Sequence, residues 1–281
     1  MAIYHCSIRI IGRSKGRSAV AYAAYCSGTK LYDKEVRKAY NYTGQNSVVH
    51  SEIDLPQNAP SEFYDREKLW NAVHEIETRS DARLAREVEV ALPREFTRQE
   101  QIDTVREYVM NNFVCKGMCA DWGIHDKEDG NPYAHILLTL RGFKPNGEWA
   151  SKSKTIYVLD ENGEKIPVID SETGEQKVRV RKGKGAEKLW QTEKVPANDW
   201  NDRSKAEEWR AAWAKECNKR LDQQHQIDHR SYDRQEVDKA STIHEGHVAR
   251  KMEREGRVSD RCEINREIRE LNKPVSYTHL T

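Results

Sequence analysis

The chain has 281 residues, of which 33% are charged and 37% are hydrophobic. No stretch approaches the roughly 18 consecutive apolar residues of a membrane helix, which excludes a transmembrane protein. The N-terminus lacks the basic-then-apolar order of a secretion signal, so we expect a cytoplasmic protein with no membrane insertion. The net charge of +1 leaves nucleic-acid binding open, because the arrangement of charge decides it rather than the total.

A strand and a short helix are predicted at the N-terminus. Residues 3–11 are rich in β-branched side chains that roughly alternate with polar ones, which is typical of a strand. Turn residues end this strand, and an alanine-rich helix is predicted at 17–27. Ser14 or Ser18 would cap the start of the helix, and Gly28 lies just past its end.

The next part of the chain contains two helices and a strand by pattern. Residues 41–60 are mostly polar and predict a loop, whereas 63–77 carry apolar residues at helical spacing. Residues 86–92 alternate with period two and stop before a proline, which predicts a strand. Thr97-Arg-Gln-Glu has the form of a capping box and predicts the start of the second helix.

Strands and hairpins dominate the predicted elements after residue 120. A short strand ends at 122–125, and residues 133–141 are the clearest strand in the chain. Residues 155–181 predict one or two hairpins, because Asn162-Gly163 is a strong turn signal. Ser204-Lys-Ala-Glu resembles a second capping box, opening a helix with a buried stripe of Trp209, Trp213, Cys217 and Leu221.

The C-terminal part differs in composition from the rest of the chain. From Asp233 the sequence is charged and helical in pattern, without an obvious apolar face. Residues 274–281 break that pattern abruptly, and we interpret them as non-native. The elements together predict an α+β fold for 1–232, an antiparallel sheet of about five strands with packed helices, followed by a charged helical extension at 233–281.

Two histidines and two glutamates are candidate metal ligands. His125 and His135 lie on adjacent predicted strands joined by a polar loop, so a hairpin would bring them together. Glu87 and Glu89 are two apart on a strand and share a face. If that face turns toward the histidines, either carboxylate completes a two-histidine, one-carboxylate site. A lone histidine on a strand is more often a hydrogen-bonded bystander, and carboxylates on a strand face are usually exposed.

The predicted N-terminal helix contains a candidate nucleophile. Tyr22 and Tyr25 are three apart and share a helix face, surrounded by alanines that allow another element to approach closely. Such tyrosines are normally half-buried packing. Beside a cation a phenol can act differently, although its ordinary pKa near 10 makes it a useful nucleophile only with help.

Two basic stretches are candidate DNA-binding surfaces. The first lies around the N-terminal helix and includes Arg13, Lys15 and Arg17, where the aromatic ring of Tyr22 could stack on bases. Trp149 is a second candidate for stacking. The other basic stretch lies in the predicted hairpins and consists of Lys177, Arg179, Arg181, Lys182, Lys184 and Lys188. A plain solvated surface explains this second stretch equally well.

Six motifs together resemble the MobA/MobL family of plasmid mobilisation relaxases. They occur in the family's order over about residues 1–246. Each motif is short, but the ordered set is specific. The motifs are Met1-Ala-Ile-Tyr-His5, Arg13 to Tyr25, Leu84 to Pro93, His125 to Thr139, Ile227 to Tyr232 and Thr242 to Gly246.

The resemblance implies a histidine-hydrophobe-histidine endonuclease dependent on a divalent metal, Mg²⁺ or Mn²⁺. In that family a tyrosine on the first helix attacks a phosphodiester of single-stranded DNA at the origin of transfer, leaving a 5′-phosphotyrosine and a free 3′-hydroxyl. The nucleophile maps onto Tyr25, and two of the three metal histidines map onto His125 and His135. The third position holds Tyr133, a poor ligand, so Glu87 or Glu89 is the candidate replacement.

The family also implies partners, namely relaxosome accessory proteins and a type IV secretion coupling protein. Two other functions remain open from the sequence. One is a rolling-circle-type replication initiator with the same tyrosine chemistry. The other is a DNA-binding mobilisation accessory protein without catalysis, in which Tyr133 marks a decayed site.

Overall fold

The computed structural model describes residues 4–128, 130–181, 185–243 and 245–273. The proposed non-native tail, 274–281, lies outside them. The chain divides into two compact units, Met1–Ile227 and Asp228–Thr281.

An antiparallel sheet forms the centre of the first unit. In the described residues it has five strands in the order β1-β5-β7-β6-β4, and three further strand pairs are β2–β3, β8–β11 and β9–β10. The predicted α+β class with about five antiparallel strands is confirmed. The strands are β1 Cys6–Gly12, β2 Lys30–Asp33, β3 Lys38–Asn41, β4 Val48–Asp54, β5 Arg83–Ala91, β6 Ala120–His125, β7 Tyr133–Thr139, β8 Ser153–Tyr157, β9 Val178–Arg181, β10 Gly185–Lys188 and β11 Thr192–Pro196.

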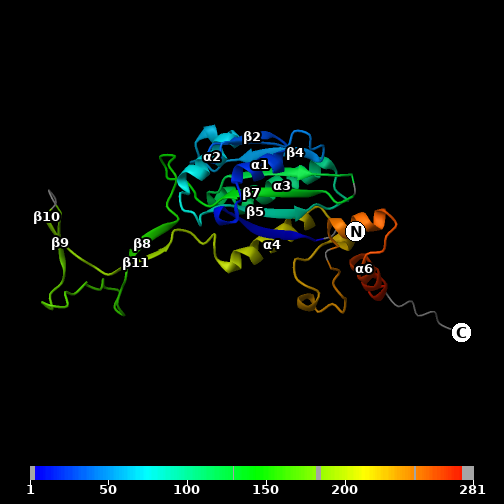
Figure 1. Ribbon diagram of the computed structural model, residues 1–281. Coiled ribbons are helices and arrows are strands. Elements are labelled where there is room, and N and C mark those ends of the chain that lie inside the picture. The colour runs from blue at the N-terminus through cyan, green and yellow to red at the C-terminus, as the bar shows by residue number, and fades with distance from the viewer. Residues whose placement is uncertain (1–3, 129, 182–184, 244, 274–281) are drawn as a thin grey trace. The chain divides into compact units, whose positions relative to one another are not determined.

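Helices cover both faces of this sheet. Within the first unit they are α1 Ala19–Ser27, α2 Arg66–Ile76, α3 Arg98–Asn112 and α4 Arg203–Asn218, with short 3₁₀ turns at η1 Arg13–Lys15, η2 Ser61–Tyr64, η3 Val114–Lys116 and η4 Gln223–His225. Figure 1 shows α1 and α2 on one side of the sheet and α4 on the other. Each side has its own buried core, and the predicted stripe of Trp209, Trp213, Cys217 and Leu221 packs into the α3–α4 core.

Local capping fixes the bounds of α1 and α3. The Ser18 hydroxyl accepts from the backbone N–H of Ala21 at the start of α1. Gly28 ends the helix in the left-handed conformation at φ 64°, which glycine adopts without a Cβ penalty. Both halves of the capping box between Thr97 and Glu100 are formed in α3. Of the two predicted caps for α1, Ser18 is therefore the one used.

Two predictions of local structure were wrong. Residues 41–60 contain β4, an edge strand, rather than only a loop. Its polar residues conceal the alternation of apolar and polar side chains that is typical of a strand. One of them, Glu52, accepts two hydrogen bonds from Arg106 of α3 at 2.9 and 2.6 Å, a contact that only the fold creates. The predicted capping box at Ser204 is absent, since α4 begins at Arg203 with Asp202 as N-cap and no side-chain cap bond. Trp200, just upstream, is buried.

Residues 151–197 form an arm of paired strands. The arm begins with β8 paired to β11, which lead out from the sheet in Figure 1. Farther along, β9 pairs with β10. Gly163 and Gly174 adopt positive φ angles of 81° and 72° at the two predicted turns, and isolated bridges flank both. The predicted hairpins are confirmed.

The second unit contains the turn η5 Asp233–Gln235 and the helices α5 Gly246–Arg254 and α6 Asp260–Leu271. Asn265 of α6 holds Ile243 by accepting from its N–H at 2.8 Å and donating to its carbonyl at 2.7 Å. Arg266 pairs with Glu253 of α5 at 2.7 Å. Polar contacts thus stabilise a pair of helices with few apolar residues. Among the described residues, no helix has the length and apolar content needed to cross a bilayer.

Candidate active site

The strand register gathers the predicted ligands on the sheet face that α1 covers. Glu89 of β5 lies directly opposite His135 of β7, which lies opposite Gly123 of β6. His125 pairs in the same way with Tyr133. Directly paired residues share a face, so Glu87, two residues from Glu89, belongs to the same surface. The hairpin that brings the two histidines together is as predicted.

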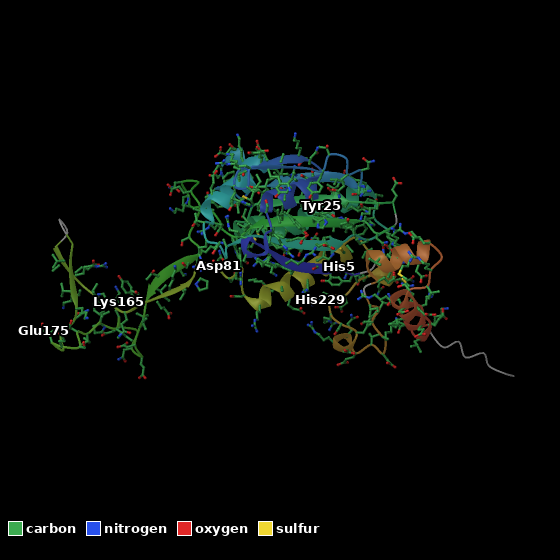
Figure 2. All side chains as sticks on the ribbon, in the orientation of Figure 1. His5, Tyr25, Asp81, Lys165, Glu175 and His229 are labelled. Atoms are coloured by element: carbon green, nitrogen blue, oxygen red, sulfur yellow. The ribbon has the colours of Figure 1, made fainter. Side chains whose placement is uncertain are left out.

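Tyr25 of α1 packs against both histidines from above this face. Its ring centroid lies 5.4 Å from that of His125 and 5.5 Å from that of His135, and the two imidazoles are 4.9 Å apart. Figure 2 labels Tyr25 among the side chains at the centre of the first unit. Tyr25 is half-buried and lines an open cleft. A helix near the N-terminus and a hairpin about 100 residues later therefore meet at one point.

The close approach of α1 depends on a glycine. A Cβ placed on Gly123 would lie 2.2 Å from the carbonyl oxygen of Cys26, the residue after Tyr25. The same carbonyl oxygen lies 2.9 Å from His125 Nε2. Because a carbonyl can only accept, Nε2 carries the proton and Nδ1 keeps its lone pair. Burial lowers the pKa of His125 to about 4, so the ring is neutral at pH 7.

His135 is held in one tautomer by Glu87. Its Nδ1–H donates a hydrogen bond to Glu87 Oε1 at 2.8 Å. Its Nε2 is buried and has no hydrogen-bond partner among the described residues. A metal-ligating histidine commonly donates its other N–H to a carboxylate in this way, leaving the second nitrogen for the cation. The orphaned Nε2 is the observation that makes this site fit a metal.

Glu87 is completely buried and fully occupied. Besides His135, it accepts from the Tyr22 hydroxyl at 2.5 Å and from Arg9 Nε at 2.8 Å. Burial opposes its ionisation, but the hydrogen bonds from His135 and Tyr22 outweigh it and hold its pKa below the usual value. Glu87 therefore supports His135 from behind in this structure.

Glu89 is the more accessible carboxylate, with a side chain 26% exposed. Its pKa is lowered, chiefly by hydrogen bonding to His5 against the effect of burial. Among the described residues, potential ligand atoms of Glu87, Glu89 and His135 all lie within 4.8 Å of one another, and His125 is not part of this group. Arg9 contacts both carboxylates, so a metal would share them with a guanidinium.

The two tyrosines of α1 have different environments. The Tyr22 hydroxyl is committed to Glu87, and burial together with that carboxylate raises the pKa of Tyr22 strongly. Burial also raises the pKa of Tyr25, but hydrogen bonding to Tyr133 and Gln45 acts in the opposite direction. Tyr25 is thus the better placed of the two to lose its proton.

An open cleft of about 610 Å³ lies beside these groups. Of the predicted site residues, it contains Tyr22, Tyr25, Arg17, Glu89 and His135. Sequence reasoning missed three others, Arg9, Tyr40 and Tyr42. The full lining is Arg9, Gly16, Arg17, Ser18, Ala21, Tyr22, Tyr25, Tyr40, Tyr42, Glu89 and His135. Arg9 alternates with apolar residues on β1, and that pattern was a usable signal. Tyr40 and Tyr42 carried none, because their neighbours are polar.

The predicted basic residues near α1 separate into two kinds. Arg17 is exposed at the cleft and Lys15 is exposed on η1. Arg13 instead contacts Glu35 and donates to the backbone carbonyls of His74 and Glu77 at 3.2 and 2.8 Å. Arg13 does not line the cleft, and its contacts are those of a residue that holds the fold together.

The described residues of the second basic stretch lie on the arm, and none of them lines the cleft. Arg179 is exposed on β9, and Lys177 pairs with Asp170 at 3.3 Å. Arg181 ends β9, while Lys182 and Lys184 lie outside the described residues. Trp149 stacks on Phe143 with a centroid distance of 4.4 Å, which makes it half-buried packing.

The MobA/MobL family profile matches residues 17–255. The chain belongs to this family. It is 42% identical over 275 residues to the probable mobilization protein MobA of Bifidobacterium longum, which covers 97% of this chain and 48% of that protein. It is 36% identical to the conjugal transfer protein TraA of Agrobacterium fabrum over 97% of this chain and 24% of that protein. The chain therefore spans about half the first relative and about a quarter of the second.

A solved structure supports the same placement. The chain is similar to one from "Molecular Basis of Vancomycin Resistance Transfer in Staphylococcus aureus", with a TM-score of 0.64 and 30% identity. The match covers 82% of this chain and 100% of the other. Membership of a mobilisation relaxase family thus rests on sequence and fold together.

Proposed function

We propose that the first unit is a DNA relaxase that nicks one strand at an origin of transfer through Tyr25. The observation that carries the proposal is the packing of the Tyr25 ring against both histidine rings, at 5.4 and 5.5 Å between centroids, beside an open cleft. A nucleophile, candidate metal ligands and room for a substrate meet there. The names of the relatives favour mobilisation over replication initiation.

The proposed reaction is a transesterification. The Tyr25 oxygen, having lost its proton, attacks the scissile phosphorus as the bond from phosphorus to the 3′ oxygen breaks. The DNA 5′ end becomes a phosphotyrosine, and the 3′ oxygen leaves and takes up a proton as a free hydroxyl. The number of phosphoester bonds is unchanged, so attack by the 3′-hydroxyl reverses the step and religates the strand.

Each residue around Tyr25 has a proposed part. His125 and His135, with Glu89 as the carboxylate, would hold Mg²⁺ or Mn²⁺. His135 would bind through its unpartnered Nε2, and His125 through Nδ1 in place of its contact with Gln45 Nε2 at 3.4 Å. When bound, the cation would polarise a non-bridging phosphate oxygen and offset developing charge. Glu87 keeps His135 in the tautomer that leaves Nε2 free. Tyr22 and Arg9 fix Glu87 in turn.

The cleft suits single-stranded DNA. Arg9 and Arg17 supply positive charge for the phosphates, and Tyr40 and Tyr42 supply aromatic faces on which bases can stack. The Tyr42 ring meets Tyr25 edge-on at 5.6 Å, so a base stacked there would lie next to the nucleophile. Duplex DNA would keep its bases paired and away from these rings. Arg179 and Lys177 of the arm would add backbone contacts.

The proposed partners and location of this chain follow from the family resemblance. We propose that the chain acts in the cytoplasm with relaxosome accessory proteins and a type IV secretion coupling protein. The parts of the relatives beyond the matched region would contribute to those interactions.

Adduct formation tests the proposal. Labelled single-stranded oligonucleotides tiling the DNA beside this gene are incubated with the protein and Mn²⁺, then separated in SDS. We expect a covalent adduct that Tyr25→Phe abolishes. The matched Tyr22→Phe variant should still form it, but more slowly, because Glu87 loses the hydrogen bond from Tyr22. Fragmentation of the tryptic peptide 18–30 by mass spectrometry should place the phosphate on Tyr25 rather than Tyr22.

Two results would contradict the proposal. A salt-sensitive gel shift without any adduct would identify a non-catalytic DNA-binding protein. An adduct unchanged in Tyr25→Phe would place the nucleophile elsewhere.

A further inference from the structure

The imidazole of His74 binds the start of α1, at the end opposite to the one that His125 contacts. His74 lies on α2 and is 7% exposed. Its Nε2 lies 3.0 Å from the backbone nitrogen of Ala19, the first residue of α1. The first N–H groups of a helix have no partner within the helix, so this imidazole acts as a cap.

The contacts around His74 determine its tautomer. The Ala19 N–H can only donate, so Nε2 must carry the lone pair and Nδ1 the proton. This Nδ1–H donates a hydrogen bond to Glu35 Oε2 at 2.7 Å. Arg13 contacts Glu35 as well, and it donates to the carbonyl of His74 itself. The ring is therefore fixed as an acceptor aimed at α1.

Ser18 caps the same turn independently. Its hydroxyl accepts from the Ala21 N–H at 3.1 Å and donates to Asp33 Oδ2 at 2.5 Å. The two caps serve different N–H groups, so neither replaces the other. Removal of the His74 acceptor would leave the buried Ala19 N–H without a partner.

We propose that neutral His74 is a positioning residue for Tyr25. Its imidazole fixes the position of α1 on the sheet, and protonation of that imidazole breaks the contact and lets α1 shift. This inference rests on the proposed function of Tyr25. α1 has only nine residues, and its other end is held by His125 through Cys26. A shift at Ala19 would move the whole helix, and Tyr25 with it.

Protonation would disrupt the cap for two reasons. The imidazolium has no acceptor to offer to the Ala19 N–H, and a cation at a helix N-terminus is unfavourable. The charged groups facing His74 are Asp33, Glu35 and Arg13. Burial, helped by Arg13, lowers the pKa of His74 despite Asp33, so the ring is neutral at pH 7.

The test compares three variants with the wild type. His74→Gln keeps an acceptor that cannot titrate, His74→Leu removes the acceptor, and Glu75→Gln changes the exposed neighbour on α2 as a control. Hydrogen exchange of the Ala19 amide is followed by NMR in ¹⁵N-alanine-labelled protein from pH 7.5 to 5. Adduct formation on the single-stranded oligonucleotides is measured over the same range.

We expect wild-type Ala19 protection and kcat to fall together only at pH values below 6.5, because burial lowers the pKa of His74 from that ordinary value. His74→Gln should retain both to lower pH. His74→Leu should lose Ala19 protection at every pH, and its kcat should drop about 10- to 100-fold with KM changed less than about twofold. Glu75→Gln should behave like the wild type.

Equal Ala19 protection in His74→Leu and wild type would overturn the proposal. If His74→Leu does not fold, the decision falls to His74→Gln, and a pH profile identical to the wild type would also overturn it. If no protein forms an adduct while Ala19 protection follows the expected pattern, the proposed function fails and the capping role of His74 stands.

Discussion

His125 Nε2 donates to the carbonyl oxygen of Cys26 at 2.9 Å, which joins one of the two site histidines to the residue directly after Tyr25. This bond connects α1, the helix of the proposed nucleophile, to the sheet, and the Nδ1 of the same ring lies 3.4 Å from Gln45 Nε2. The polar group that positions Tyr25 is thus also a candidate metal ligand. A substitution of His125 should therefore affect both the position of Tyr25 and the binding of a metal.

The close contact beneath this bond predicts the effect of Gly123→Ala. A methyl group would lie 2.2 Å from the Cys26 oxygen and must push α1 away from the sheet. We expect unfolding free energy to fall by about 1–3 kcal/mol and adduct formation to be lost. Urea unfolding and the adduct assay measure the two effects. Gly44→Ala, where a Cβ meets nothing within 4 Å, is the control and should leave both unchanged.

The buried ring of His125 predicts a dependence of stability on pH. Its pKa falls from 6.5 to about 4 on folding, so the unfolded chain binds more protons between these values. The stability contribution is complete above pH 6.5 and is lost as the pH falls toward about 4, on the order of 1–3 kcal/mol. Urea unfolding of metal-free protein at several pH values checks this. A His125→Gln variant should show a shallower loss, and an equally steep one would contradict the assignment.

Tyr133 lies at the position to which the family resemblance assigns a third histidine, and we therefore predict a gain of metal affinity on Tyr133→His. The Tyr133 ring lies 5.4 Å from His125 and 5.3 Å from His135 between centroids, so an imidazole there would be close to both. We expect Mn²⁺ to bind about tenfold more tightly, measured by calorimetry. Tyr133→Phe should leave the affinity unchanged. Tighter binding in the Phe variant would show that the phenol obstructs the site rather than lacking a donor.

Substitution of Arg13 is predicted to reduce stability, whereas substitution of Arg17 is predicted to weaken DNA binding. Arg13 holds the end of α2 through two backbone carbonyls, so Arg13→Ala should cost about 1–3 kcal/mol of stability. Arg17 is exposed at the cleft, so Arg17→Ala should preserve stability and weaken single-stranded DNA binding. The dependence of DNA binding on salt, measured as the slope of log affinity against log salt concentration, should be less steep by about 0.7 in this variant. Urea unfolding and fluorescence anisotropy at several salt concentrations separate the two; a normal slope in Arg17→Ala would rule out a phosphate contact.

Features governed by near neighbours were predictable from the sequence. The Thr97 capping box, the Asn162-Gly163 turn and the strand of His135 all depend on residues within a few positions of one another. The proximity of His125 and His135 followed from the hairpin of β6 and β7. β4 was missed because its polar residues are satisfied by Arg106, which lies on α3, far away in the chain.

The sequence by itself determined the residue types of the site and the elements that carry them. Only the tertiary structure decided which of them meet. It directs Tyr22 to Glu87 and leaves Tyr25 at the histidines, it withdraws Arg13 into the fold, and it brings Arg9 to the carboxylates. The reason is physical: local pattern specifies the face of an element, whereas strand order, register and the steric room at Gly123 set the distances across which side chains act.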